Sequence, residues 1–87
     1  MNEPEATKLI MDVLEDLKLV DAEQRRIFEA DGNEDLELAA LNIDSMAVID
    51  LCMKLEDGLG REVQVEELVE NPKVRQLARH FSGSGRT

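Results

Sequence analysis

The stretch Leu41-Asn42-Ile43-Asp44-Ser45-Met46 places a serine at the point where a loop ends and a long amphipathic helix begins. A residue at the start of a helix faces backbone N–H groups that have no partner within the helix, and it also faces the positive end of the helix dipole. A phosphate group at such a position is stabilised. We expect Asp44 to cap the helix, because its carboxylate can accept a hydrogen bond from the first turn. Ser45 is therefore a candidate anchor for a phosphorylated group.

The helix that starts after Asp44 is expected to run to Asp57 and to be stopped by Gly58 and Gly60. Apolar residues spaced i, i+3, i+4, i+7 and i+11 form one stripe along it, which predicts its buried face. The stripe consists of Val48, Leu51, Cys52, Leu55 and Leu59. Cys52 is thus interpreted as a small buried apolar residue without a redox role.

A second apolar group on the same helix lies outside this stripe and contains Met46, Ile49 and Met53. We expect Ile49 to complete the core. The two methionines are expected to stay exposed beside Asp50 and Asp57. Methionine side chains can adapt their shape to different partner proteins, and the carboxylates can orient those partners. This side of the helix is a candidate docking face.

Apolar periodicity also predicts the other elements. A first helix is expected from just after Pro4 to about Leu19, with negative charge in its first turn. Residues 20–43 are interpreted as a long ordered loop, with a short helical turn possible over 24–28. Four apolar residues are expected to pin this loop to the core: Leu36, Leu38, Leu41 and Ile43.

Towards the C-terminus, residues 63–65 are expected to form an extended link and residues 66–69 a brief helical turn. The last helix is predicted to have Asn71 as its cap and Pro72 as its first residue, and to reach Phe81. Residues 1–81 are then one domain, and residues 82–87 a flexible tail. The fold class predicted is all-α: a small bundle of four helices, three longer and one short, with a long loop between the first two.

Composition narrows the function further. The 87 residues include 20 acids and 10 bases, for a net charge of −10. The negative electrostatic potential of such a chain repels nucleic acid and anionic membranes and attracts proteins with basic patches. A single cysteine excludes an internal disulfide framework, and no apolar run approaches the ~18 residues of a membrane span. We therefore expect a cytoplasmic monomer.

The residues do not form a catalytic constellation. Ser45 is outside a G-x-S-x-G elbow, and His80 has no partner pattern that would make it a base. His80 is interpreted as a last-turn residue or a partly buried polar edge. The acidic run 29–35 resembles a calcium loop only superficially, because Glu34 stands where the turn needs glycine and Ala40 where a bidentate glutamate is needed. One cysteine and one histidine also exclude a structural zinc site.

Three segments together resemble the acyl carrier protein family: Asp44-Ser45-Met46, the helix from Val48 to the glycine pair at 58 and 60, and the run Asn71-Pro72-Lys73-Val74-Arg75-Gln76-Leu77-Ala78. The resemblance extends from about Lys8 to Phe81. It implies a four-helix acyl-carrier-like bundle that is not an enzyme. It also implies that Ser45 carries a covalent 4'-phosphopantetheine arm, with Asp44 as the helix cap beside it.

The resemblance implies partners as well. A phosphopantetheinyl transferase would move the arm from coenzyme A to Ser45, with Mg²⁺ serving that enzyme. Acyl-loading, condensing and tailoring enzymes of a fatty-acid, polyketide or related pathway would then act on the acyl thioester through basic patches. The positions that match the family's docking residues are Met46, Asp50, Met53, Glu56 and Asp57.

Three departures from the family pattern concern the pathway. Asn42 stands where glycine is common, Ala47 stands where an acid often follows the serine, and Lys54 interrupts the acidic face. These departures favour a specialised pathway, and the start at Met1 favours a free-standing carrier. A peptidyl or aminoacyl carrier of a non-ribosomal peptide pathway is the first alternative, although the strong acidity favours an acyl cargo. A non-catalytic acidic helical interaction module is a more distant one.

Overall fold

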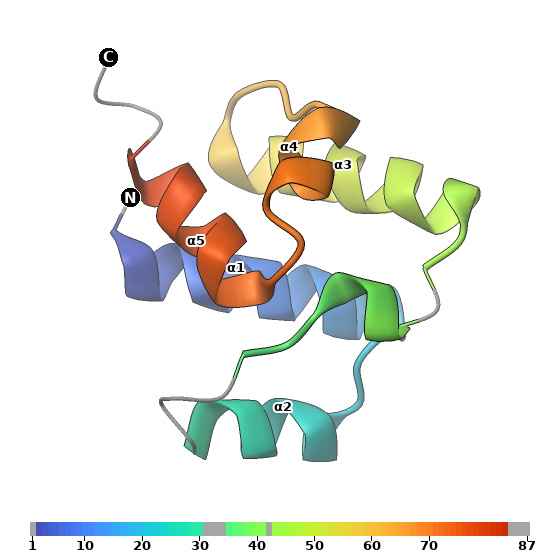
Figure 1. Cartoon of the computed structure of the whole chain (residues 1–87), viewed down its shortest axis with the longest axis vertical. Coiled ribbons are helices and arrows are strands. Elements are labelled where there is room, and N and C mark those ends of the chain that lie inside the picture. The colour runs from blue at the N-terminus through green and yellow to red at the C-terminus, as the bar shows by residue number, and fades with distance from the viewer. Residues whose placement is uncertain (1, 31–34, 42, 84–87) are drawn as a thin grey trace.

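The structure is a computed structural model, and it describes residues 2–30, 35–41 and 43–83. This part of the chain contains α1 (Glu3–Asp16), α2 (Ala22–Ala30), the 3-10 helix η1 (Leu38–Leu41), α3 (Ser45–Leu59), α4 (Val65–Glu70) and α5 (Val74–Gly83). Figure 1 shows α1 in the middle, with α5 packed against it, α3 and α4 on one side and α2 on the opposite side. The predicted all-α bundle is confirmed, with one α-helix more than the four expected.

The first helix begins slightly earlier and ends earlier than predicted. The Asn2 side chain accepts a hydrogen bond from the Glu5 backbone N–H at 2.9 Å, so α1 starts at Glu3. At the other end, Lys18 adopts a positive φ of 62°, and the Leu19 N–H turns back to the Leu14 carbonyl at 2.9 Å. This left-handed turn ends the helix before Leu19.

The segment interpreted as a long loop contains a full helix, α2. Asp21 Oδ1 accepts from the Gln24 N–H at 2.8 Å, and Gln24 Oε1 accepts from the Asp21 N–H at 3.0 Å. This reciprocal capping box was visible in the sequence as an aspartate followed three residues later by a glutamine. Arg25 then ties α2 to α1 through ion pairs of 2.6 Å to Asp12 and 2.9 Å to Glu15.

The third helix continues through Gly58, which was expected to stop it. Its end is at Gly60, which has the left-handed φ of 72° that favours glycine, and whose N–H donates to the Glu56 carbonyl at 2.8 Å. Gly58 has another role, because a Cβ there would lie 2.5 Å from Leu9 Cδ1 on α1. The missing side chain therefore lets α1 and α3 approach closely.

The start of the last helix corrects the prediction for Asn71 and Pro72. Asn71 is the C-cap of α4, and its side-chain amide donates to the Glu67 carbonyl at 2.9 Å. Pro72 precedes α5, which begins at Val74. The first N–H groups of α5 are satisfied by a distant loop, since Val74 donates to the Leu36 carbonyl and Arg75 to Asp35 Oδ1, both at 2.9 Å.

The C-terminal boundary of α5 also differs from the prediction. The helix includes Ser82 and Gly83, which were expected to belong to the tail. The rest of the predicted tail, residues 84–87, lies outside the described residues. Across the part of the chain that is described, no helix combines the length and the apolar character needed to cross a bilayer.

The core is built from the predicted stripes of three helices. Its largest contributions are Ala6, Ile10, Met11, Val13 and Leu14 from α1, Leu51, Cys52 and Leu55 from α3, and Val74, Leu77, Ala78 and Phe81 from α5. The predicted loop pins are confirmed, since Leu38 and Leu41 are buried and Leu36 and Ile43 pack against the core. Ile49 is not in the core: it is 55% exposed, because a core of this size is filled by the neighbouring stripe of α3.

Candidate functional site

The loop before α3 and the first turn of α3 hold Ser45 in place. Asp44 has extended backbone angles, and its side chain accepts a hydrogen bond from the Ala47 N–H at 2.8 Å. Its carbonyl accepts from the Val48 N–H at 2.9 Å. Asp44 is therefore the N-cap, as its residue type predicted, and Ser45 is the first residue of the helix.

Ser45 is exposed, so another protein can reach its hydroxyl. Within the described residues, the cap engages the N–H groups of Ala47 and Val48, and no acceptor is found there for the N–H groups of Ser45 and Met46. These first-turn amides and the positive end of the α3 dipole lie beside the hydroxyl. This arrangement fits a phosphate ester on the serine oxygen.

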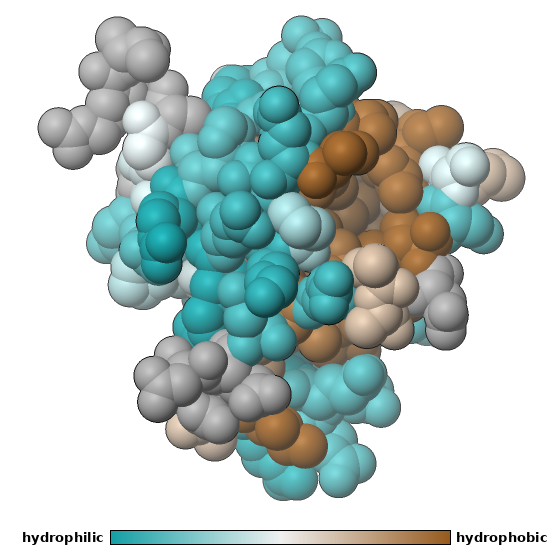
Figure 2. All heavy atoms as spheres, in the orientation of Figure 1, coloured by the Kyte–Doolittle hydropathy of each residue, from teal (hydrophilic) through white to brown (hydrophobic). Residues whose placement is uncertain are grey.

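An apolar hollow of about 220 Å³ lies beside this helix start. Ile43 and Val48, which line it, flank Ser45 in the sequence. Figure 2 shows apolar side chains gathered over α3, α4 and η1. The other lining residues are also apolar: Leu38, Ala39, Leu51, Val65, Leu68, Val69 and Pro72. The described lining of this hollow is thus apolar throughout, a feature that periodicity in the sequence could not reveal.

The side chains predicted for docking differ in their surroundings. Met46 and Met53 are 75% and 60% exposed, and Asp50 and Asp57 are also exposed. Glu56 is only half-buried and accepts a hydrogen bond from the Val63 N–H at 3.1 Å, so it anchors the loop after α3. Ile49 lies between the methionines in sequence and is exposed like them.

Lys54 was expected to interrupt the acidic face of α3. Its ammonium instead lies 2.7 Å from the Asp16 carboxylate on α1, and this contact raises the pKa of Lys54. The positive charge is thus turned towards α1. Asp16 was not singled out in the sequence, because nothing in the spacing of residues 16 and 54 indicates that they meet.

A half-buried polar cluster joins the loop after α3 to α4 and α5, and the sequence did not reveal it. Glu67 on α4 lies 2.8 Å from Arg61 Nη2 and 2.8 Å from His80 Nε2 on α5. The hydrogen bonds from Arg61 above all, together with those from Gln64 and His80, outweigh burial and lower the pKa of Glu67 to about 2. His80 therefore lies in the last turn of α5 and is also a partly buried polar edge, so both predicted placements are confirmed.

The sequence argued against two kinds of metal site, a calcium loop and a structural zinc site. Within the acidic run 29–35 that resembles a calcium loop, residues 31–34 lie outside the described residues. Among the residues that are described, no group of three or more histidine, cysteine, aspartate or glutamate side chains is arranged to hold a metal ion.

Burial raises the pKa of the Cys52 thiol, with nearby Glu56, Glu67 and Glu66 acting in the same direction.

The structure thus combines an exposed serine at a capped helix start with an apolar hollow in a small acidic bundle, an arrangement that suits a phosphate-linked group. Comparison with known families agrees with this interpretation. The model of the family described as "Phosphopantetheine attachment site" matches residues 8–81. The chain belongs to this family, whose covalent cofactor is 4'-phosphopantetheine and whose domains carry the arm rather than act as catalysts.

Two relatives illustrate the range of this family. An acyl carrier protein homolog of Ureaplasma parvum is 32% identical over 68 residues, which cover 78% of this chain and 88% of that protein. Nonribosomal peptide synthetase 2 of Gibberella zeae is 42% identical over 43 residues, which cover 49% of this chain but 1% of the synthetase. No solved structure matches the chain significantly.

Proposed function

We propose that this chain is an acyl carrier protein whose arm is attached to Ser45. The observation that carries the proposal is the exposed Ser45 at the first residue of α3, next to the Asp44 cap and in the first turn of the helix. A phosphopantetheinyl transferase would join the Ser45 oxygen to the phosphate of the arm. The hydroxyl proton leaves, and the pyrophosphate bond of coenzyme A breaks to release adenosine 3',5'-bisphosphate.

The residues around Ser45 would orient and stabilise the attached group. Asp44 keeps the first turn of α3 formed, so the amides of Ser45 and Met46 stay directed at the phosphodiester. When attached, the arm supplies a thiol that holds acyl groups as thioesters. The raised pKa of the buried Cys52 keeps the protein's own thiol from competing in this chemistry.

An assay of loading tests the attachment site directly. The chain is incubated with coenzyme A, Mg²⁺ and a broad-specificity phosphopantetheinyl transferase, and its intact mass is measured. The wild type and Ser82→Ala are expected to gain one arm, because Ser82 lies on α5, away from the start of α3, and its hydroxyl donates to the Arg79 carbonyl of the same helix. Ser45→Ala should gain none. An unchanged mass in the wild type, or a gain in Ser45→Ala, would refute the proposed site.

The acyl cargo is supported by the apolar hollow beside Ser45. At about 220 Å³ it is small beside the roughly 300–1,000 Å³ pockets that take drug-sized ligands. We therefore propose a short acyl group in a fatty-acid, polyketide or related pathway. An aminoacyl cargo is the second candidate, favoured by the similarity to the peptide synthetase.

Loading the arm with defined groups separates the two cargoes. The transferase loads the wild type from butyryl-coenzyme A or from glycyl-coenzyme A, and the methyl NMR shifts of the two loaded chains are compared. A butyryl group is expected to shift the methyl signals of Leu38, Val48 and Leu68, which line the hollow, whereas the charged glycyl group should leave them in place. Equal shifts, or shifts with glycyl only, would contradict the acyl assignment.

The exposed side of α3 is the proposed docking face for the transferase and for the acyl-loading, condensing and tailoring enzymes. It combines Met46, Ile49 and Met53 with the exposed carboxylates of Asp50 and Asp57. Charge reversal at either aspartate should slow transfer by basic partner enzymes without changing the helical circular dichroism. The matched control is Glu23→Lys on α2, which lies on the opposite side of α1 (Figure 1).

A further inference from the structure

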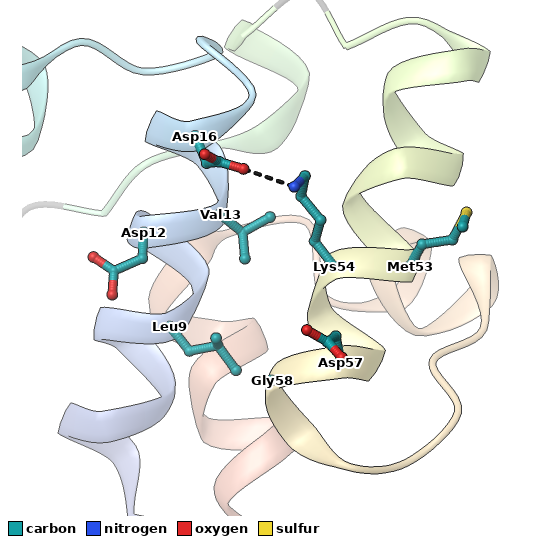
Figure 3. A pocket seen from close by; sticks show the side chains of 8 residues that line it. All are labelled: Leu9, Asp12, Val13, Asp16, Met53, Lys54, Asp57 and Gly58. Atoms are coloured by element: carbon teal, nitrogen blue, oxygen red, sulfur yellow. Dashed lines mark ion pairs between the residues drawn. The ribbon is translucent and has the colours of Figure 1, made fainter.

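A second hollow, of about 670 Å³, lies between α1 and α3 and is separate from the apolar hollow at Ser45. Figure 3 shows Leu9 and Val13 pointing from α1 towards α3, and Lys54 reaching back from α3 to Asp16. Leu9 also points towards Gly58, where the absent side chain leaves room. We call this hollow the α1–α3 groove.

The groove combines an apolar floor with an acidic rim. Val13 is buried and Leu9 is half-buried, whereas Asp16 on α1 and Asp57 on α3 are exposed. Such a surface suits a long basic side chain, whose methylene stem covers apolar groups while its charged end meets carboxylates. The groove is thus shaped for a cation with an aliphatic stem.

Lys54 demonstrates this mode of binding within the chain itself. Its ammonium lies 2.7 Å from Asp16 Oδ2, yet both side chains remain open to water, at 46% and 63% exposure. An ion pair between exposed groups is weak and exchanges easily, because water screens both charges. An incoming cation can therefore replace Lys54 at Asp16.

The position of the groove along α3 indicates which partner reaches it. Residues 53–58 follow Ser45 by eight to thirteen helical residues, or about 12–20 Å at the usual rise. Met53, which is 60% exposed, forms the outer edge of the groove and also belongs to the docking face. An enzyme that acts on Ser45 and lies along α3 extends to the groove.

We propose that the α1–α3 groove is a second docking site for the phosphopantetheinyl transferase, and that it receives an arginine or lysine side chain of that enzyme, which replaces Lys54 at Asp16. The proposal rests on the proposed function at Ser45. The net charge of −10 favours a basic partner, and the carboxylates of Asp16 and Asp57 supply the local complement. Docking then involves α1 as well as α3.

Four variants test the groove: Asp16→Asn, Lys54→Gln, the double variant, and Glu23→Gln as the control for loss of one exposed carboxylate. The initial loading rate by the transferase at low chain concentration gives kcat/KM, and intact mass after long incubation gives the end point. Asp16→Asn should lower kcat/KM about 3–10-fold, Lys54→Gln should raise it about 2–5-fold, and added salt should reduce both differences. Glu23→Gln should match the wild type.

The double variant separates the proposal from a simpler role for Asp16. If Asp16 contacts the transferase, Asp16→Asn lowers the rate about 3–10-fold in the Lys54→Gln background too. If Asp16 only restrains Lys54, the substitution has no effect once Lys54 is gone, and the proposed docking site is overturned. Complete loading of all variants at equal rates also overturns it. No loading of the wild type at the end point would instead refute the function at Ser45.

Binding can also be observed without transfer. The Ser45→Ala chain, labelled with ¹⁵N, is titrated with the transferase, and amide shifts are followed by NMR. The amides of Leu9, Val13 and Asp16 on α1 are expected to shift together with those of α3, and the α1 shifts should be lost in the Ser45→Ala/Asp16→Asn chain. Shifts confined to α3 would overturn the docking site.

Discussion

The carboxylate of Asp44 accepts a hydrogen bond from the Ala47 backbone N–H at 2.8 Å, and Ser45 lies in the turn that this bond closes. The bond joins the loop to the helix at the point where the arm is proposed to attach. Through this bond, Asp44 can hold the first turn of α3 in place at Ser45 without contacting the cargo itself. The stability of α3 and the geometry at Ser45 therefore depend on the same side chain.

Removing this cap should cost stability. Asp44→Ala is expected to lower the free energy of unfolding by about 0.5–2 kcal/mol, because a first-turn N–H loses its acceptor. Asp44→Asn keeps an acceptor oxygen and should lose much less. Urea unfolding followed by circular dichroism measures both variants, and equal losses in the two would show that the negative charge matters more than the cap.

Two neighbours on α3 should respond differently to truncation. Leu51 is fully buried, so Leu51→Ala should destabilise the bundle by about 2–5 kcal/mol. Ile49 is 55% exposed, and Ile49→Ala should change the free energy of unfolding by no more than about 0.5 kcal/mol. Urea midpoints compare them, and a large loss in Ile49→Ala would mean that this residue packs in the core after all.

The Glu67 cluster should make stability depend on pH in a defined direction. The pKa of Glu67 is about 2 in the folded chain against an ordinary value of 4.5. The charged carboxylate therefore stabilises the fold above pH 4.5, and this contribution is lost as the pH falls towards 2. A depression of this size corresponds to roughly 3–3.5 kcal/mol.

Glu67→Gln isolates that contribution from the other carboxylates. At pH 7 the variant is expected to unfold with a free energy lower by about 1–3 kcal/mol, because Arg61 and His80 lose their charged partner. At pH 3 the gap between variant and wild type should be smaller. Urea titrations at the two pH values measure the gap, and an equal gap at both would argue against a charge effect.

Cys52 should be unreactive while the chain is folded. Its thiol is buried and its pKa is raised, so little thiolate is available at pH 8. Alkylation by iodoacetamide should be at least about tenfold slower in buffer than in urea. After loading, the folded chain should gain one fast-reacting thiol, whereas Ser45→Ala treated in the same way should gain none. Rapid alkylation of the unloaded folded chain would contradict this account of Cys52.

Much of the bundle could be predicted because local patterns specify it. The apolar stripes of α1, α3 and α5 are periodic, so their buried faces followed from spacing alone. Asp44 is a strong capping residue in a local context, and its role also followed. The capping box of Asp21 and Gln24 was a local signal for α2 that the sequence contained and that the apolar pattern concealed.

The errors at the helix ends have a different physical origin. Asn71 and Pro72 carry the local signature of a helix start, but the first amides of α5 are satisfied by Asp35 and Leu36 instead. A contact between residues 35 and 75 leaves no trace in short-range spacing. Because these tertiary hydrogen bonds satisfy its first amides, α5 begins at Val74 and not at Pro72 as predicted.

Local sequence patterns were enough to predict the fold class, the buried stripes and the capped serine, because each depends on residues within a few positions of one another. Helix packing had to be known before the two hollows, the exposure of Ile49, the pairing of Lys54 with Asp16 and the Glu67 cluster could be described. These features bring together side chains that are far apart along the chain, and helix packing sets their distances. Local periodicity does not predict these long-range contacts, since the same apolar stripes could pack against different helices.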